Sequence, residues 1–463
     1  MAISFGPIAS GLPKDIVQQI MKAERAPVEQ IEARKGNLSA KKDLVSKLLT
    51  LTQEIKALVD KNKNPEDLRE LKVMSNEEIV DISLDKKIAR PGSYTFEVKK
   101  MAQKSGAISS GFADKAESYI GVGFIQYTLP NGETKDVYIG QNESSLEGVA
   151  KVINNSDMGI TASVVNDGTG TEKPWRVILS LKETGDDYVA NFPHFYFVDG
   201  EDDFYLESER KAHDALVALD GFEIETQESK SSDLIPGATI TYKKAKPGEE
   251  FTIEIVEDVK AITEKIKAIL EKINEVLKFI QEQNTLDSKS DTKKTLGGDL
   301  VLQTLESKIR SAMFTPVPTQ WGMRRGNDLG ITFNKKGFLD FDEKKFENVL
   351  SQNYQQVAEI LTGMLNEDNV REKGLINSLD ENLVASVRYP DGILQSRKNT
   401  FESGIKQIDR QIESKERMLE QKERNLKNKF ARLEETISRI KGQGAGLQAL
   451  GAQVGQMSLG ASG

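Results

Sequence analysis

The sequence predicts an α+β multidomain protein with a nested architecture: a terminal α-helical coiled-coil leg, a helical domain and two β-rich outer domains. This prediction rests on the spacing of apolar residues along the 463-residue chain. Near both ends they recur with the period of a helix, whereas in the middle they alternate with polar residues, as in strands. Helical stripes at both extremities pack most simply if the chain runs outward and returns, with its ends side by side. The domains are then nested rather than sequential.

The N-terminal region has the pattern of amphipathic helices. Its strongest stripe follows alternating steps of four and three residues, at Leu44, Leu48, Leu51, Ile55 and Leu58. A thinner stripe precedes it, at Ile16, Ile20, Val28, Ile31 and Leu38. Pro27 interrupts the thinner stripe. Because proline removes a helical hydrogen bond, Pro27 is expected to start a new helix or to kink this one.

The middle of the chain has the pattern of short strands. From about residue 73 apolar and polar residues alternate, first at Val80, Ile82 and Leu84 and then at Tyr94, Phe96 and Val98. Hairpin turns are expected at Asn131–Gly132 and Pro247–Gly248, and residues 145–154 read as a short helix. Further strands are expected within residues 124–140, 160–168, 175–181 and 237–256. This β section is long enough for two domains.

The helical period returns near residue 258. One uninterrupted face, expected to be core, runs through Ile262, Ile266, Ile269, Ile273, Val276 and Ile280. A small β hairpin is expected around Lys335–Lys336–Gly337, before a helix that begins at Asp342. Beyond Phe401 the chain is expected to be helical to about residue 440. Residues 442–463 contain many glycines and no charged residue, so they are not expected to order by themselves.

The changes of period indicate the domain boundaries, and the polar and acidic run from Asp199 to Asp214 is a reasonable place for the chain to leave the outermost domain. Because the helical segments flank the β section on both sides, each outer domain is inserted into the one before it. The predicted domains are the terminal coiled-coil leg (1–42 and 413–463), the helical domain with its small hairpin (43–72 and 258–412), a β-rich domain (73–108 and 213–257) and an outermost β-rich domain (109–212).

The last helix carries only half of a coiled-coil seam. Apolar residues recur every seven positions, at Ile405, Ile412, Leu419, Leu426, Leu433 and Ile440. Lys415, Lys422 and Lys429 occupy the positions where a second apolar row is expected, and three successive lysines rule out a tightly sealed dimer. The pattern favours a helix that pairs loosely with the N-terminal stripe and keeps its apolar row for a partner. An autonomous coiled coil is the alternative.

The composition excludes several classes of function. The net charge of −9 argues against nucleic acid as the main partner, because phosphate binding needs clustered lysine and arginine. No run of 18 apolar residues and no signal-peptide pattern is present, so neither a membrane partner nor the usual secretory route is expected. Cysteine is absent, which excludes disulfides and thiol catalysis.

No catalytic, cofactor-binding or metal site can be recognised in the sequence. The two histidines, His194 and His213, lie in the β section without the spacing of metal ligands. The acidic run at residues 199–204 lacks the spacing of a calcium loop, and such runs are more often solvated turns. With 72 aspartates and glutamates in the chain, no carboxylate pair is informative. We therefore expect no enzyme, no cofactor and no bound metal.

Six segments of the chain follow an order found in one known family. In the first, Ser10, Gly11 and Leu12 precede a helix, a charged stretch and Pro27. The others are residues 90–103, 218–243, 298–310, 329–350 and 391–438. Together they resemble the flagellar filament cap family, hook-associated protein 2, over nearly the whole chain. The segment from about 109 to 212 resembles it least.

The resemblance implies terminal helices that form a leg, a helical domain and two β-rich domains that form a plate. It implies a non-enzymatic cap at the distal end of the bacterial flagellar filament, which promotes insertion and folding of exported flagellin subunits. The implied location is extracellular, at the flagellum tip, after export through the flagellar type III system without a cleaved signal peptide. The implied partners are flagellin, hook–filament junction proteins, a flagellar export chaperone and further copies of this chain in a pentamer or hexamer.

A loosely held apolar row suits a surface that docks and releases. We therefore predict a docking surface for the filament or flagellin at Ile16, Ile20, Ile31, Leu38, Leu419, Leu426, Leu433, Ile437 and Ile440. The alternative function is a secreted adhesin that binds a surface through residues 109–212. A third, a hydrolase in the β section, would depend on His194 or His213.

Overall fold

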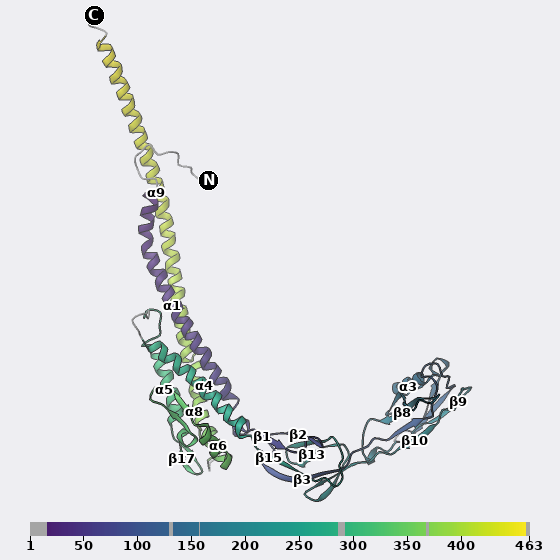
Figure 1. Ribbon diagram of the computed structural model, residues 1–463. Coiled ribbons are helices and arrows are strands. Elements are labelled where there is room, and N and C mark those ends of the chain that lie inside the picture. Colours follow the sequence, from purple (N-terminus) through teal and green to yellow (C-terminus); the bar gives the residue numbers. More distant parts are fainter. Residues whose placement is uncertain (1–15, 129–132, 157, 286–291, 367–369, 460–463) are drawn as a thin grey trace. The chain divides into compact units, whose positions relative to one another are not determined.

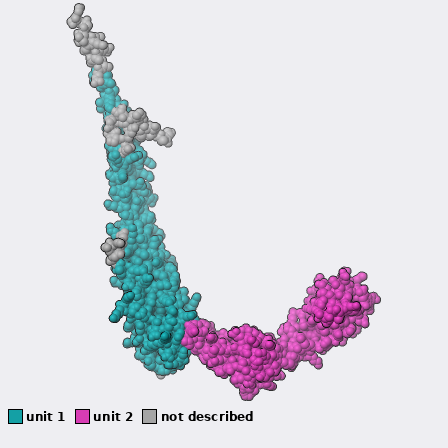
Figure 2. Space-filling model, in the orientation of Figure 1, with its two compact units in different colours: residues 1–65, 263–463 teal, residues 66–262 magenta. Residues whose placement is uncertain are grey.

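The computed structural model describes residues 16–128, 133–156, 158–285, 292–366 and 370–459. The chain divides into two compact units (Figure 2). Residues 66–262 form the β unit, and the segments on either side, 1–65 and 263–463, form the helical unit. The β unit is thus inserted into the helical unit, which confirms the predicted nested α+β multidomain class. The finer division into four domains stays a prediction.

Two long helices, α1 (Ile16–Asp60) and α9 (Ile393–Leu459), run side by side in the helical unit (Figure 1). α1 continues through Pro27, so of the two expected outcomes, a new helix or a kink, the first is wrong. Proline leaves the carbonyl four residues earlier without its helical partner. That residue, Ala23, is exposed, so water can donate to its carbonyl instead.

The glycine-rich C-terminal segment differs from its prediction. α9 continues past residue 440 as far as Leu459, whereas these residues were not expected to order. The segment contains no proline, and its glycines alternate with good helix formers such as alanine, glutamine and leucine. Because it extends an existing helix, it adds hydrogen bonds without the unfavourable step of nucleation.

Shorter elements complete the helical unit. The predicted hairpin is confirmed as β18 (Ile331–Phe333) and β19 (Leu339–Phe341). The helix predicted from Asp342 is also confirmed, since the Asp342 side chain caps it by accepting from the Lys345 amide at 3.0 Å. The remaining elements are α4 (Val259–Asn284), α5 (Leu300–Phe314), β16 (Val317–Thr319), β17 (Gly322–Arg324), η3 (Gly326–Leu329), α6 (Glu343–Gln352), α7 (Tyr354–Thr362) and α8 (Leu375–Val387), with the four-residue α2 (Pro65–Leu68) at the boundary in sequence.

The core of the helical unit lies between α1, α4, α5 and α8. The face of α4 predicted as core is confirmed, because its six aliphatic residues are at most 3% exposed. Leu48 and Ile55 of α1 are completely buried, and each such side chain contributes about 1.5–3 kcal/mol. Two ion pairs tie the elements together, Lys56 of α1 to Asp380 of α8 at 2.9 Å and Arg397 of α9 to Asp299 before α5 at 2.7 Å.

The β unit contains two cores, each between two antiparallel sheets. The inner core lies between the sheets β1-β15-β3-β11-β12 and β13-β14-β2. Phe96, Ile240 and Ile253 are among its fully buried side chains. The bounds are β1 (Leu71–Met74), β2 (Val80–Leu84), β3 (Gly92–Lys100), β11 (Ala215–Leu219), β12 (Phe222–Thr226), β13 (Lys230–Ile235), β14 (Ala238–Tyr242) and β15 (Phe251–Glu257).

The outer core lies between the sheets β10-β4-β8-β7 and β6-β5-β9, with α3 packed against it. Phe112, Ile125 and Leu146 are completely buried there. The bounds are β4 (Gly106–Ser109), β5 (Val122–Thr128), β6 (Thr134–Ile139), η1 (Gln141–Glu143), α3 (Leu146–Asn155), β7 (Ile160–Asn166), β8 (Trp175–Leu181), η2 (Asp186–Tyr188), β9 (His194–Val198) and β10 (Leu206–Arg210).

Most strand predictions are confirmed, with one correction. The turn predicted at Asn131–Gly132 lies outside the described residues, although β5 and β6 do pair. The chain does turn at Pro247–Gly248, but the strands on its two sides are not partners. β14 pairs with β13 and β2, whereas β15 pairs with β1 and β3. Alternating patterns locate strands, but they do not encode which strand lies beside which.

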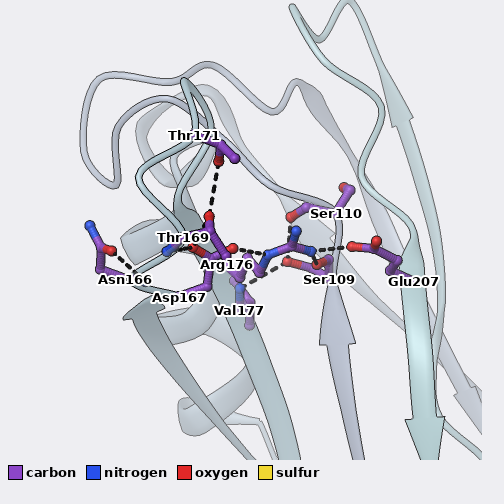
Figure 3. Close-up of polar contacts among 10 residues, drawn as sticks. Ser109, Ser110, Asn166, Asp167, Thr169, Thr171, Arg176, Val177 and Glu207 are labelled. Atoms are coloured by element: carbon purple, nitrogen blue, oxygen red, sulfur yellow. Dashed lines mark hydrogen bonds and ion pairs between the residues drawn. The ribbon is translucent and has the colours of Figure 1, made fainter.

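One arginine joins three segments of the outer region (Figure 3). The Arg176 guanidinium of β8 donates to Asp167 at 2.7 Å, to the Ser109 carbonyl at 3.0 Å and to Glu207. Asp167 also accepts from the Thr169 hydroxyl at 2.6 Å and from the Thr169 amide at 3.0 Å. These two bonds, followed by the one from Arg176, lower the pKa of Asp167 to about 2.

We expect Asp167→Asn to flatten the acid-side stability profile of the outer region. In the wild type, the stabilisation is complete above about pH 4 and is lost as the pH falls toward about 2, because the folded carboxylate must then take up a proton. Asparagine cannot titrate. Thermal unfolding followed by Trp175 fluorescence over this pH window would measure the difference, in a Trp321→Phe background that removes the second of the two tryptophans. Equal slopes in both proteins would contradict this role for Asp167.

Candidate docking surface on the terminal helices

Ion pairs fix the register of α1 against α9. As residue numbers rise along α1 they fall along α9, so the helices are antiparallel. All the paired side chains are at least 40% exposed, and such pairs contribute less than about 1 kcal/mol each. They therefore set the register more than the strength of the pairing. The pairs are Glu24 with Lys422 at 2.7 Å, Arg25 with Glu416 at 3.7 Å and Lys35 with Asp409 at 2.6 Å.

Apolar burial between the two helices is thin. Val28 of α1 is 1% exposed, and Phe401 and Ile408 of α9 are 7% and 4% exposed. At Gly404 the helices approach closely, since a Cβ there would lie 2.9 Å from Leu38 Cδ2. The predicted docking residues of this stretch are only half-buried, namely Ile16, Ile20, Ile31, Leu38, Leu419 and Leu426.

The second row of the seam lies one position away from the predicted lysine row. Lys415, Lys422 and Lys429 are all exposed. The half-buried positions beside the main apolar row are instead Glu416, Glu423 and Phe430. Each lies four residues after one member of the apolar row and three before the next, on the same side of the helix. The seam is thus half apolar, as the sequence indicated. The residues that occupy its other half are mainly acidic, and Glu416 meets the basic Arg25 of α1.

α9 extends beyond the described start of α1 (Figure 1). Because Glu24 lies opposite Lys422, Ile16 lies near Phe430. Past that point Leu433 is 44% exposed, Ile440 61% and Leu447 71%, while Ile437 is half-buried. We call Leu433, Ile437, Ile440 and Leu447 the terminal stripe.

The structure therefore divides the predicted docking residues into two groups. Six lie on the paired stretch of α1 and α9, and three belong to the terminal stripe. Leu447 was missed, because the segment after residue 440 was not expected to be helical. Its position, seven residues after Ile440, could have identified it. Val28 was placed in the N-terminal stripe but not among the docking residues, although its side chain is only 1% exposed.

The candidate metal ligands considered in the sequence do not form a cluster in the described part of the chain. There, no group of three or more histidine, aspartate or glutamate residues could hold a metal ion. His194 is exposed, and His213 contacts the Asp214 carbonyl through Nδ1 at 3.0 Å. Asp202 of the acidic run is paired with Lys173. None of the described helices has an apolar stretch long enough to cross a membrane.

Comparison with known proteins places the chain in a family. A family model for the N-terminus of flagellar hook-associated protein 2 matches residues 10–105, and a model for the C-terminus of the same protein matches residues 212–442. The chain belongs to the flagellar hook-associated protein 2 family. The resemblance carried by the six sequence segments is thereby confirmed. The two models leave residues 106–211 unmatched, and these residues form the outer sheets and their core.

Several known proteins are similar to this chain. The chain is 26% identical over 436 residues to the A-type flagellar hook-associated protein 2 of Pseudomonas aeruginosa, and the match covers 88% of each chain. A crystal structure of the D1-D2-D3 domains of the Escherichia coli flagellar cap protein covers 78% of this chain and 100% of that chain, with a TM-score of 0.57 at 17% identity, so the fold is shared. A flagellar cap protein from Bdellovibrio bacteriovorus is 43% identical over 39% of this chain and 99% of that chain, with a TM-score of 0.36.

We expect Val28→Ala to loosen the pairing of α1 with α9, because it removes buried methyl groups at a fully covered point of a thin seam. The loss should be about 1–3 kcal/mol. Hydrogen exchange measured by mass spectrometry should show faster exchange in α1 around residue 28 and in the facing part of α9, with the β unit unchanged. Lys35→Ala, which removes an exposed ion pair, is the control and should cost less than about 1 kcal/mol. An equal effect of both changes would contradict pairing by apolar burial.

Proposed function

We propose that this protein caps the distal end of the bacterial flagellar filament and promotes insertion and folding of exported flagellin subunits. Membership of the flagellar hook-associated protein 2 family is the observation that carries the proposal. The same membership favours the cap over a surface adhesin as the main function. The cap acts through binding surfaces and makes or breaks no covalent bond.

The proposed docking surface consists of the nine residues predicted from the sequence, together with Leu447. A permanent coiled coil would cover its apolar row along its whole length. Here, burial is complete only at a few positions near Val28 and Ile408, and it gives way to exposed Leu433 and Ile440. Exposed apolar residues in a row mark an interaction site. An apolar surface on the filament or on arriving flagellin would cover them.

The small apolar area buried between α1 and α9 matters for the proposed insertion of flagellin subunits. A cap must hold the filament tip and still give way each time a subunit is inserted. Few fully buried residues and largely exposed ion pairs make the pairing of α1 with α9 weak enough to rearrange locally. We therefore propose that the leg occupies positions which the incoming subunit later takes, and that it then docks again.

The remaining partners follow from this function. We propose that several copies of the chain form a ring, either a pentamer or a hexamer, which contacts hook–filament junction proteins before flagellin arrives. An export chaperone would hold the exposed row of α9 before secretion through the flagellar type III system. The site of action is then extracellular, at the tip of the flagellum.

Replacing both Leu433 and Ile440 by Asp should abolish filament growth. Each change puts a charge where the proposal requires an apolar contact, and burying an unpaired carboxylate is strongly unfavourable. The variant would be expressed in a strain that lacks its own cap protein, and filament length would be measured by electron microscopy. Met418→Asp is the matched control, because Met418 is 59% exposed on the same helix but outside the apolar row. Filaments of normal length from the double variant would refute the docking surface.

A second measurement separates docking from assembly. Multi-angle light scattering of the full-length wild type and of the Leu433→Asp, Ile440→Asp variant should give the same oligomer over a range of concentrations. The reason is that the terminal stripe is proposed to face the filament rather than a neighbouring copy. Loss of the oligomer in the variant would show that the stripe is a contact between subunits.

A further inference from the structure

The outer sheet β6-β5-β9 presents an aromatic row on its exposed face. Tyr138, Phe124 and Tyr196 lie directly opposite one another on the three strands, with Phe124 in the middle. Their exposed fractions are 72%, 37% and 48%. The neighbouring residues of the same strands, such as Ile125 and Ile139, point to the other face and are completely buried in the outer core. The aromatic row is therefore a surface feature and not part of the core.

The rings form an ordered array. Phe124 and Tyr196 are stacked, with ring centroids 4.8 Å apart and planes inclined by 25°. Tyr138 and Tyr196 stand on the two outermost strands of this sheet. The row spans two interstrand spacings, about 10 Å, which is the scale of a short oligosaccharide.

A polar row lies beside the aromatic row. Gln126 is opposite Asp136 on one side and His194 on the other, and its amide donates to Asp136 Oδ1 at 3.0 Å. Asp136 and His194 are exposed. On the opposite side of the aromatic row, Val122 faces Val198, which is 59% exposed. The face thus combines flat apolar rings with hydrogen-bonding groups at one edge.

The charge of this face limits what can bind to it. No lysine or arginine is found among its ten described residues, and its one charged group is the carboxylate of Asp136. A polyanion, such as nucleic acid, an acidic glycan or an anionic membrane, would meet no compensating charge. An apolar peptide would cover the rings but would leave the amide, carboxylate and imidazole of the polar row without partners, which is unfavourable. The residues are Val122, Phe124, Gln126, Thr128, Thr134, Asp136, Tyr138, His194, Tyr196 and Val198.

We propose that this face binds a neutral polysaccharide. A sugar ring offers an apolar C–H face, which packs on Tyr138 and Tyr196, and a rim of hydroxyl groups, which exchange hydrogen bonds with Asp136, Gln126 and His194. One class of ligand can then cover the aromatic row and also form hydrogen bonds with the polar row. The binding goes beyond the capping function and does not depend on it, because the face is far in sequence from the terminal helices and lies in the segment that the family models leave unmatched.

The test is direct binding by the full-length protein. Isothermal titration with soluble neutral polysaccharides (dextran, mannan, galactan and a β-glucan) is compared with hyaluronan and heparin as anionic probes. We expect binding to at least one neutral polymer, and at least tenfold weaker binding after Tyr138→Ala combined with Tyr196→Ala. Phe222→Ala is the matched control, since Phe222 is 74% exposed in the same unit but outside this face. It should leave the affinity unchanged.

Three results would overturn the proposal. These are no binding to any neutral polymer, a preference for the anionic probes, and equal affinity of the double variant and the wild type. Folding of the variants is checked by Trp175 fluorescence, because Trp175 packs against the outer core. The double variant should still support filament growth when it is expressed in a strain that lacks its own cap protein. This result separates failure of the polysaccharide proposal from failure of the capping function.

Discussion

The antiparallel pairing of the first and last helices is the contact on which the rest of the helical unit depends. It brings Glu24 and Lys422, from opposite ends of the sequence, within 2.7 Å of each other. The pairing is anchored where α1 enters the core, at Leu48 and Ile55, and where α9 contacts α5 through Arg397 and Asp299. α1 and α9 are both anchored in the core of the helical unit. The chain can therefore leave this unit after α1, form the β unit and return.

Burial decreases along these helices away from that core, with Val28 as a buried exception, and this gradient underlies the proposed docking surface. Near the core the apolar side chains are fully covered, further out most are half-buried, and in the terminal stripe all but the half-buried Ile437 are exposed. A helix of this kind has little to gain from its own partner at its outer end. A contact with another molecule at that end would add apolar burial to the helical hydrogen bonds that already extend α9. The gradient therefore separates a packed part of α9 from the part proposed to bind, without any break in the helix.

The β unit follows a different principle, since each of its two regions is stabilised by its own pair of sheets. The outer region is closed by local polar contacts as well as by its core, with Arg176 joining segments that flank Ser109, Asp167 and Glu207. Because the outer region has its own core and polar contacts, its surface residues can change without disturbing the inner sheets. The aromatic row of β6, β5 and β9 lies on such a region, so the proposed binding face would be an addition to a structural scaffold.

The sequence by itself determined the order of helical and β segments, the buried face of α4, the hairpin near Gly337 and the apolar row of α9. Each of these is a local period, and local periods are set by backbone geometry. It did not determine that β14 and β15 belong to different sheets, that α1 continues through Pro27, or that Glu416 and Glu423 rather than the lysines complete the seam. Those outcomes depend on which surfaces meet in space. The proposed docking row of α9 was recognisable from the sevenfold spacing of Leu419, Leu426, Leu433 and Ile440. Which of these residues α1 covers and which stay exposed was decided only by the antiparallel register of the two helices.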